Sequence, residues 1–231
     1  MSMVLDSNSN LEMINYILHL ETATKVCSVA LSNNGNMVSC KETMAEGFIH
    51  SESLTLFCEE VMAEANVSLS ALSAISVSSG PGSYTGLRIG LSTAKGLCFA
   101  LKIPLISVET LMALKELVPI GPESIIPMLD ARRMEVYAQV FASDGTVLQS
   151  LDAIELDETS FSEFEPFIVC GDGAAKCIEM WGNRNIIWND QLLCSAEGQA
   201  SIAYEKFQKK EFENLAYFTP IYLKDANGVR R

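Results

Sequence analysis

One segment of the sequence has the residue types and spacing of an anion-binding loop. The run Ser79-Gly80-Pro81-Gly82-Ser83 lies between a strand-like stretch and a predicted helix that extends to about Leu101. Backbone N–H groups and the positive end of a helix attract anions at such a junction. The segment lacks the Lys-Ser/Thr ending of a P-loop and the G-x-G-x-x-G spacing of a dinucleotide-binding loop. A tight connection that holds no ligand is the alternative.

A second polar segment, Leu20-Glu21-Thr22-Ala23-Thr24, falls in the turn between the first two predicted strands. In actin-like ATPases such a turn faces the nucleotide phosphates, with the acid reaching a magnesium ion and the hydroxyls donating to phosphate. Here the acid is Glu, one methylene longer than the Asp usual there. An ordinary polar turn is the alternative, because such turns are common. The predicted vestigial nucleotide or anion site comprises Glu21, Thr22, Thr24, Gly80, Gly82 and Ser83.

The helix after the glycine loop carries only small residues on one of its faces. They lie four residues apart and are Gly86, Gly90, Ala94 and Cys98. A glycine inside a helix costs about 1 kcal/mol against alanine, so the close approach of another helix is expected to offset this cost. That helix can be internal or can belong to a partner, and the spacing does not separate the two. An earlier predicted helix, from about Ser51 to Ala65, has apolar residues at helical spacing. The residues predicted to support a partner contact or a homodimer are Leu54, Phe57, Val61, Gly86, Gly90, Ala94 and Cys98.

The residue types that hold metals or act as nucleophiles are sparse. The only histidines are His19, within a strand-like run, and His50, just before a predicted helix. The seven cysteines form no CxxC pair, and we expect them to be buried free thiols. There is no HExxH motif and no nucleophile–base pair that spacing identifies. We therefore expect no metal site and no catalytic residue.

Composition and charge narrow the class of protein. Of the 231 residues, 48% are hydrophobic and 19% are charged, which supplies ample material for a core. A net charge of −13 repels phosphate backbones, so another protein would have to hold any nucleic acid. No apolar run reaches the roughly 18 residues of a membrane helix, and Met1 to Asn10 has no secretory pattern. These features predict a cytoplasmic protein without a membrane anchor.

The hydrophobic pattern predicts two related α/β lobes, because each half begins with a strand meander and then alternates helix and strand. Strands are expected at 16–21, 25–31, 37–43, 74–78, 104–108, 125–130, 135–141, 146–151 and 167–170. Helices are expected at 51–65, 85–101, 109–118, after 173 and at 195–207. The predicted division is a disordered tail (1–13), an N-terminal lobe (14–118) completed by the C-terminal segment, and a degenerate C-terminal lobe (119–231).

The run from Ser79 to Gly90 resembles the signature of the TsaB (YeaZ) family, whose loop commonly reads G-P-G-S-[FY]-T-G-L-R-I-G. Weaker landmarks of the family follow in order along the chain. They are Ile17–Thr24 with Cys27–Leu31, His50–Leu54, Asp130–Tyr137, Gly171–Gly173 and Pro220–Leu223. The resemblance spans about Ile14 to Lys224, which is nearly the whole chain.

The resemblance implies an actin-like fold (ASKHA, related to Hsp70 and sugar kinases) with a reduced second lobe. It also implies a part in installing threonylcarbamoyl on the adenosine beside the anticodon of tRNAs. In that family the catalytic, metal-holding subunit is the paralogue TsaD. TsaB pairs with TsaD through the first two helices of its N-terminal lobe, here 51–65 and 85–101, and helps recruit the ATPase TsaE. The tRNA would be reached only through the complex.

Two functions from different classes follow from these observations. The first is a non-catalytic subunit that binds a TsaD-like protein and a TsaE-like ATPase, with no tightly bound cofactor. A nucleotide at the TsaD junction and a homodimer of the isolated chain both remain open. The second is a stand-alone actin-like ATPase or phosphotransferase that uses the Glu21–Thr24 turn and the Gly80–Ser83 loop. This second function predicts magnesium-dependent ATP binding and turnover by the isolated protein.

Overall fold

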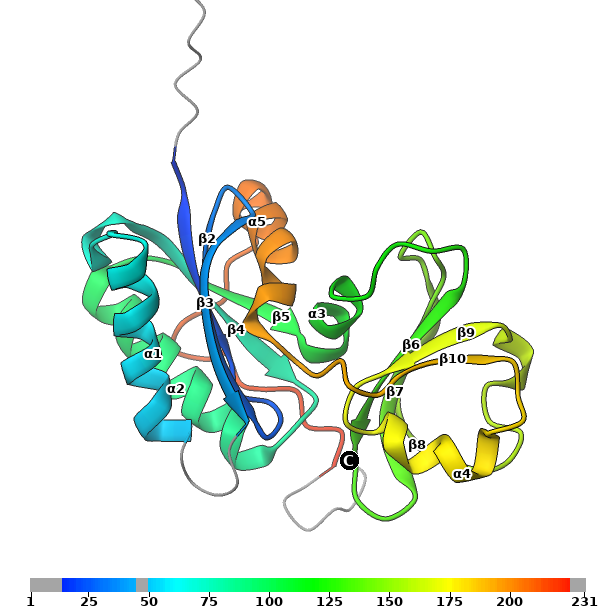
Figure 1. Ribbon diagram of the computed structural model, residues 1–231. Helices are drawn as coiled ribbons and strands as arrows, with labels where there is room; N and C mark the ends of the chain where they lie inside the picture. The colour runs from blue at the N-terminus through cyan, green and yellow to red at the C-terminus, as the bar shows by residue number, and fades with distance from the viewer. Residues whose placement is uncertain (1–13, 45–49, 225–231) are drawn as a thin grey trace, which may run out of the picture.

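Two five-stranded mixed sheets form the centres of two lobes that lie side by side (Figure 1). This computed structural model describes residues 14–44 and 50–224. The predicted tail at 1–13 therefore lies outside the described residues. The strands of the first sheet fall between residues 16 and 109 and those of the second between 124 and 189. Where the domain boundary falls stays a prediction.

The first sheet has the strand order β3-β2-β1-β4-β5. Its strands are β1 (Tyr16–Glu21), β2 (Val26–Asn33), β3 (Asn36–Met44), β4 (Leu72–Gly80) and β5 (Leu105–Glu109). The first three form the predicted antiparallel meander, and β4 and β5 run parallel to β1. The β2–β3 hairpin turns at Asn34 and Gly35, with φ of 50° and 80°. Asn-Gly favours this conformation at both positions, which explains why the sequence predicts the hairpin.

The second sheet repeats the connectivity of the first. Its strands are β6 (Ser124–Asp130), β7 (Glu135–Phe141), β8 (Val147–Glu155), β9 (Phe167–Cys170) and β10 (Ile186–Asn189), in the order β10-β9-β6-β7-β8. Here too a three-stranded antiparallel meander is followed by two strands parallel to its first member. The predicted relation between the two halves is visible in this shared order. The sequence did not predict β10, which is a four-residue edge strand.

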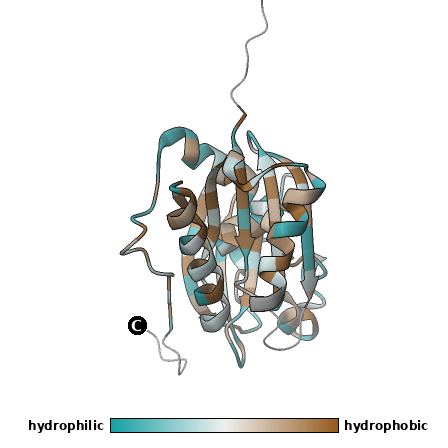
Figure 2. Cartoon of the chain, turned by 90° about the vertical axis from the view of Figure 1, so that its left-hand side faces the viewer, coloured by the Kyte–Doolittle hydropathy of each residue, from teal (hydrophilic) through white to brown (hydrophobic). Residues whose placement is uncertain are grey.

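Helices cover both faces of the first sheet. The long helices α1 (His50–Glu64) and α2 (Tyr84–Leu101) lie side by side on one face, and α5 (Ala200–Lys209) packs on the other (Figures 1 and 2). Side chains alternate across a strand, so Leu18 and Leu20 of β1 join the core under α1 and α2 while Ile17 joins the core under α5. The short helix α3 (Thr110–Glu116) contacts β6 and lies between the lobes.

The second lobe has much shorter helices. The predicted helix after Gly173 is a 3-10 turn, Ala174–Cys177, followed by a single turn of α-helix, α4 (Ile178–Trp181). The Trp181 side chain fills the core of this lobe, with Phe161 and Phe167 edge-on to its ring at 6.1 and 6.2 Å. An aromatic cluster thus forms much of the core beside these short helical turns.

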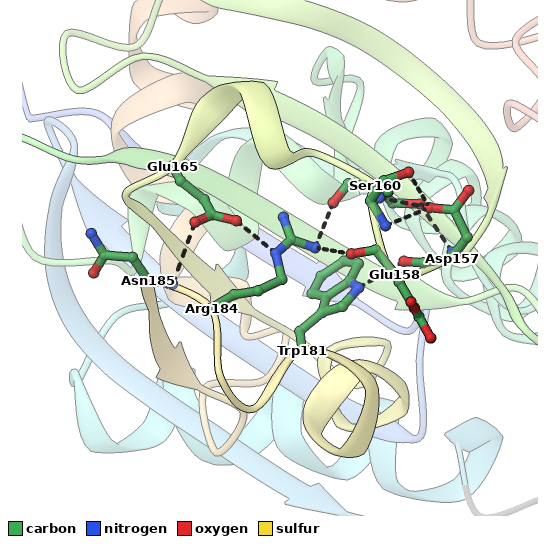
Figure 3. A network of polar contacts seen from close by, with 8 residues as sticks. Asp157, Glu158, Ser160, Glu165, Trp181, Arg184 and Asn185 are labelled. Atoms are coloured by element: carbon green, nitrogen blue, oxygen red, sulfur yellow. Dashed lines mark hydrogen bonds and ion pairs between the residues drawn. The ribbon is translucent and has the colours of Figure 1, made fainter.

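Arg184 closes this aromatic core from the loop side (Figure 3). Its Nε donates to Glu165 at 2.6 Å, and Nη1 donates to the carbonyl oxygens of Glu158 and Ser160. The guanidinium also lies over the Trp181 ring, 4.7 Å from its centroid. One side chain therefore connects the 157–165 loop to the chain that leads into β10.

Replacing Arg184 with Leu should destabilise the protein by about 3 kcal/mol. The Oε1 atom of Glu165 and the carbonyl oxygens of Glu158 and Ser160 would lose the Arg184 donor, and an unsatisfied buried polar group costs about 1–3 kcal/mol. Urea unfolding followed by tryptophan fluorescence measures the change. Arg133→Leu, at an exposed turn position, is the matched control and should change stability by less than about 0.5 kcal/mol. Equal effects of the two substitutions would contradict a role for the Arg184 network.

Candidate functional site

The Glu21 carboxylate is fully buried at the end of β1 and is bonded within the chain. Its Oε1 accepts from the Ala23 N–H at 2.7 Å, and its Oε2 accepts from the Ser78 hydroxyl. Burial raises the pKa of this carboxyl above its ordinary value, and the hydrogen bonds from Ser78 and the backbone oppose that rise. Both oxygens are thus engaged in holding the β1–β2 turn against β4.

Thr22 binds the start of α2. Its hydroxyl donates to the carbonyl oxygen of Gly86 at 2.8 Å. A Cβ on Gly86 would overlap the Thr22 carbonyl oxygen, and one on Gly90 would overlap the Thr22 hydroxyl. The two helix glycines are therefore needed for contact between α2 and the turn. This contact, which lies within the chain, offsets the loss of helix propensity at the two glycines.

The glycine-rich loop rests directly on the same turn. The Ser83 N–H donates to the Ala23 carbonyl oxygen at 2.6 Å, and a Cβ on Gly82 would overlap that oxygen. The Ser83 hydroxyl caps α2 by accepting from the Gly86 N–H at 3.2 Å. Gly80 has φ of 108°, and a Cβ there would lie 2.6 Å from the Ile221 carbonyl oxygen.

The structure thus brings together the two segments predicted to form the anion site. Their polar groups form hydrogen bonds with one another. The N–H groups of Ser83 and Gly86 already have acceptors. Thr24 accepts from the Val26 N–H at 3.2 Å and so stabilises the turn itself. A cleft of about 470 Å³ lies elsewhere, between Glu42–Met44 on β3 and the segment 191–195. Anion binding by the predicted residues stays a prediction, and in this arrangement the groups that would bind an anion hold the turn and the loop together.

The predicted partner-contact residues lie in the seam between the helix pair and the first sheet. Six of them are buried and Phe57 is half-buried in the same cluster. The buried residues are Leu54, Val61, Gly86, Gly90, Ala94 and Cys98. Of the two roles that the sequence left open for the small face, internal packing is the one seen here. An interface role for these residues would have to act through the outer face of the same helices.

That outer face has small and apolar residues that the sequence analysis did not single out. Ser92, Gly96 and Ala100 are exposed and also lie four residues apart on α2. Beside them, 80% of Phe99 is accessible, and on α1 51% of Leu56 is accessible. Figure 2 looks onto these two helices. Because both faces of α2 have small residues at the same spacing, sequence periodicity alone could not say which one is exposed.

His19 belongs to a polar network inside the first lobe. Its ring nitrogens lie 2.6 Å from the Ser76 hydroxyl and 2.7 Å from the Ser32 hydroxyl. Ser76 donates to the Gln199 side-chain oxygen at 2.7 Å, and the Gln199 amide donates to Ser78 at 3.1 Å. His19 therefore has a structural role, and the network connects the N-terminus of α5 to β1 and β4.

The cysteines are free thiols, as the sequence predicts. Six of the seven are buried and Cys40 is half-buried. Within 14–44 and 50–224, no three or more His, Cys, Asp and Glu side chains form a group that could hold a metal ion. None of the described helices is long and apolar enough to cross a membrane.

Two lobes with the same strand order define an actin-like α/β fold. The activator of 2-hydroxyisocaproyl-CoA dehydratase from Clostridium difficile shares this fold, with a TM-score of 0.50 at 11% identity over 87% of this chain and 99% of that one. YeaZ from Pseudomonas aeruginosa is more similar, with a TM-score of 0.80 at 27% identity over 90% of this chain and all of that chain.

Sequence comparison identifies the family. A family model described as "TsaD: tRNA N6-adenosine threonylcarbamoyltransferase" matches residues 48–229. The "tRNA threonylcarbamoyladenosine biosynthesis protein TsaB" of Haemophilus influenzae is 32% identical over 223 residues, which cover 90% of this chain and 93% of that protein. The chain belongs to the TsaB (YeaZ) family, within the wider group that the TsaD model covers.

Two glycine substitutions in α2 should have opposite effects on stability. Gly86→Ala should destabilise the protein by about 2 kcal/mol or more, because the added Cβ would overlap backbone atoms of the turn and force a local shift. Gly96→Ala should stabilise by about 0.5–1 kcal/mol, since that Cβ would meet nothing within 4 Å and alanine favours the helix. Urea denaturation measures both. Effects of the same sign would contradict the contact between α2 and the β1–β2 turn.

The buried His19 should make stability fall as the pH drops. Burial lowers the pKa of His19 to about 3 from 6.5, so between these values the unfolded chain binds a proton that the folded chain excludes. The His19 contribution is therefore complete above pH 6.5 and declines below it, by up to about 1.4 kcal/mol per pH unit. Glu21, whose pKa is raised, adds an opposite slope that remains in a His19 variant.

The test compares wild type with His19→Asn by urea unfolding at pH 7.5, 6.0 and 5.0. The stability advantage of the wild type should shrink by about 2 kcal/mol between pH 7.5 and 5.0. Parallel pH profiles for the two proteins would contradict this, by showing that the pKa of His19 is the same in the folded and the unfolded chain.

Proposed function

We propose that this chain is a non-catalytic subunit required for the threonylcarbamoyl modification of the adenosine beside the anticodon in tRNAs. The observation that carries the proposal is its 32% identity, over 90% of its length, to a protein named for threonylcarbamoyladenosine biosynthesis. The match of residues 48–229 to the TsaD model supports a paralogous relation to the catalytic subunit.

The proposed action is heterodimerisation with a TsaD-like catalytic subunit and help in recruiting a TsaE-like ATPase. A non-catalytic role is supported by the positions of the polar residues. Both ring nitrogens of His19 are paired with serines, and both oxygens of Glu21 are bonded inside the lobe. The net charge of −13 fits a subunit that leaves tRNA binding to its partners.

We place the TsaD-like contact on the outer face of α1 and α2, the pair of helices that the family resemblance implies. On this face Leu56 and Phe99 expose large apolar side chains beside the small residues Ser92, Gly96 and Ala100. Small side chains allow a second helix to approach closely, and exposed apolar groups then become buried. The same surface could pair two copies of the isolated chain.

Gly96→Arg should weaken binding of the TsaD-like subunit by at least about tenfold while the protein remains folded. The position is open, with nothing within 4 Å of the added Cβ, so the arginine projects into the proposed interface. Gly96→Ala is a same-site control that should bind normally. Ser201→Arg adds the same charge on the exposed side of α5, away from α1 and α2, and should also bind normally. Gly90→Arg is not suitable, because its side chain would collide with Thr22 inside the lobe.

Isothermal titration calorimetry with the purified TsaD-like subunit measures the affinities. Mass spectrometry of tRNA nucleosides then reports whether modification requires this chain in a reconstituted mixture with its partners. Equal binding by Gly96→Arg and wild type would place the interface elsewhere. Tight ATP binding and turnover by the isolated chain would instead support the ATPase function.

A further inference from the structure

The segment after α5, residues 210–224, runs from the first lobe to the second as an irregular strap (Figure 1). It first pairs with the edge strand β5. The Glu213 N–H donates to the Leu105 carbonyl oxygen at 2.9 Å, and the Ser107 hydroxyl donates to the Glu213 carboxylate at 2.5 Å. The start of this C-terminal strap is thus fixed to the first sheet.

The middle of the strap lies along α2. Lys95 donates to the Phe218 carbonyl oxygen at 2.9 Å. Further on, the Tyr222 ring packs on Tyr84 with centroids 5.0 Å apart, and the Tyr222 hydroxyl accepts from Arg88 at 3.3 Å. The Ile221 N–H donates to the Ser79 carbonyl oxygen at 2.7 Å, at the base of the glycine-rich loop. The strap therefore follows the first lobe as far as the N-terminus of α2.

The end of the strap enters the second lobe. The Lys224 side chain is only 5% exposed and forms an ion pair with Glu135 on β7. Its ammonium also lies 3.4 Å from the Ala131 carbonyl oxygen, in the β6–β7 turn, and 5.9 Å from the centre of the Tyr137 ring. A buried ammonium is costly unless it is paired. Lys224 therefore has a strong preference for remaining on this hairpin.

The strap is a third crossing between the lobes. The backbone crosses twice more, between α3 and β6 (117–123) and between β10 and the helical turn at 196 (190–195). Figure 1 shows the strap passing between the lobes below these two covalent crossings. With only the two neighbouring backbone crossings, one lobe could rotate relative to the other about a hinge formed by them. A third crossing at a distance from that hinge resists this rotation. Unlike the other two crossings, the strap is held to the second lobe by side-chain contacts of Lys224. It can therefore detach from that lobe without any break in the backbone.

We propose that the C-terminal strap is a latch, closed by the Lys224–Glu135 ion pair, that holds the two lobes in one relative arrangement. It couples the β6–β7 hairpin of the second lobe to the N-terminus of α2 and to the glycine-rich loop. Opening the latch frees the hinge while both sheets stay folded.

The experiment measures the distance between the lobes in solution. Spin labels are placed at Ser201 on α5 and Ser150 on β8, both exposed, in a background with the half-buried Cys40 replaced by Ser. Pulsed electron–electron double resonance gives the distribution of distances between the two labels for the parent, Lys224→Met, Glu135→Gln and the double variant. Lys209→Met is the control, because it removes only an exposed ion pair with Glu205 within α5.

The latch predicts a single narrow distribution for the parent and Lys209→Met. It predicts a distribution at least twice as wide for Lys224→Met and for Glu135→Gln. The distribution of the double variant should be no wider than that of Lys224→Met, because both substitutions remove the same ion pair. Hydrogen exchange at Ile221 and Glu135 should become at least tenfold faster, while β1 and β9 stay protected. Unchanged widths in folded variants would overturn the proposal. A loss of protection throughout the second sheet would also overturn it, by showing that the pair only stabilises that lobe.

Discussion

The contact between the β1–β2 turn and the start of α2 determines the arrangement of the first lobe. Thr22 bonds to Gly86, the Ser83 N–H bonds to Ala23, and the two helix glycines leave space for these contacts. Because α2 is fixed at its N-terminus against the turn, its position along β4 and its rotation about its own axis are fixed as well. The rotation decides which stripe of the helix faces α1 and the sheet and which faces solvent.

The same contact explains why residues that resemble an anion site can serve the fold. In the loop and the turn, carboxylate, hydroxyl and backbone N–H groups lie close together, as an anion site would require. Here the Thr22 hydroxyl and the Ser83 N–H each find an acceptor in the opposing segment, and Glu21 is bonded to Ser78 and Ala23 at full burial. Satisfied buried polar groups specify one arrangement, because a displaced partner would leave an unpaired group in a dry interior. A rigid helix pair of this kind would suit the proposed partner contact, since a preformed surface loses less conformational freedom on binding.

Polar contacts between segments distant in the sequence hold the first lobe together and connect it to the second. Gln199, at the start of α5, bonds with Ser76 and Ser78 of β4 and with the Leu20 carbonyl oxygen. The strap beyond α5 returns to the glycine-rich loop and ends on the second lobe at Lys224. Residues 196–223 thus complete the first lobe, although they follow the second lobe in the sequence. This explains how a small protein with a reduced second lobe can hold two sheets together.

The sequence alone determined the features that depend on neighbouring residues. Asn34-Gly35 specified the first hairpin, Ser83 and the following apolar period specified α2, and the Ser79–Gly90 run identified the family. These signals are local, because turn geometry, capping and helical period involve residues only a few positions apart. Only the tertiary structure decided which small-residue stripe of α2 is buried, since Gly86–Cys98 and Ser92–Ala100 have the same spacing. It also decided that the Glu21 carboxylate points into the protein and that Lys224 binds the other lobe. Those outcomes depend on contacts between residues far apart in the chain, and periodicity carries no information about them.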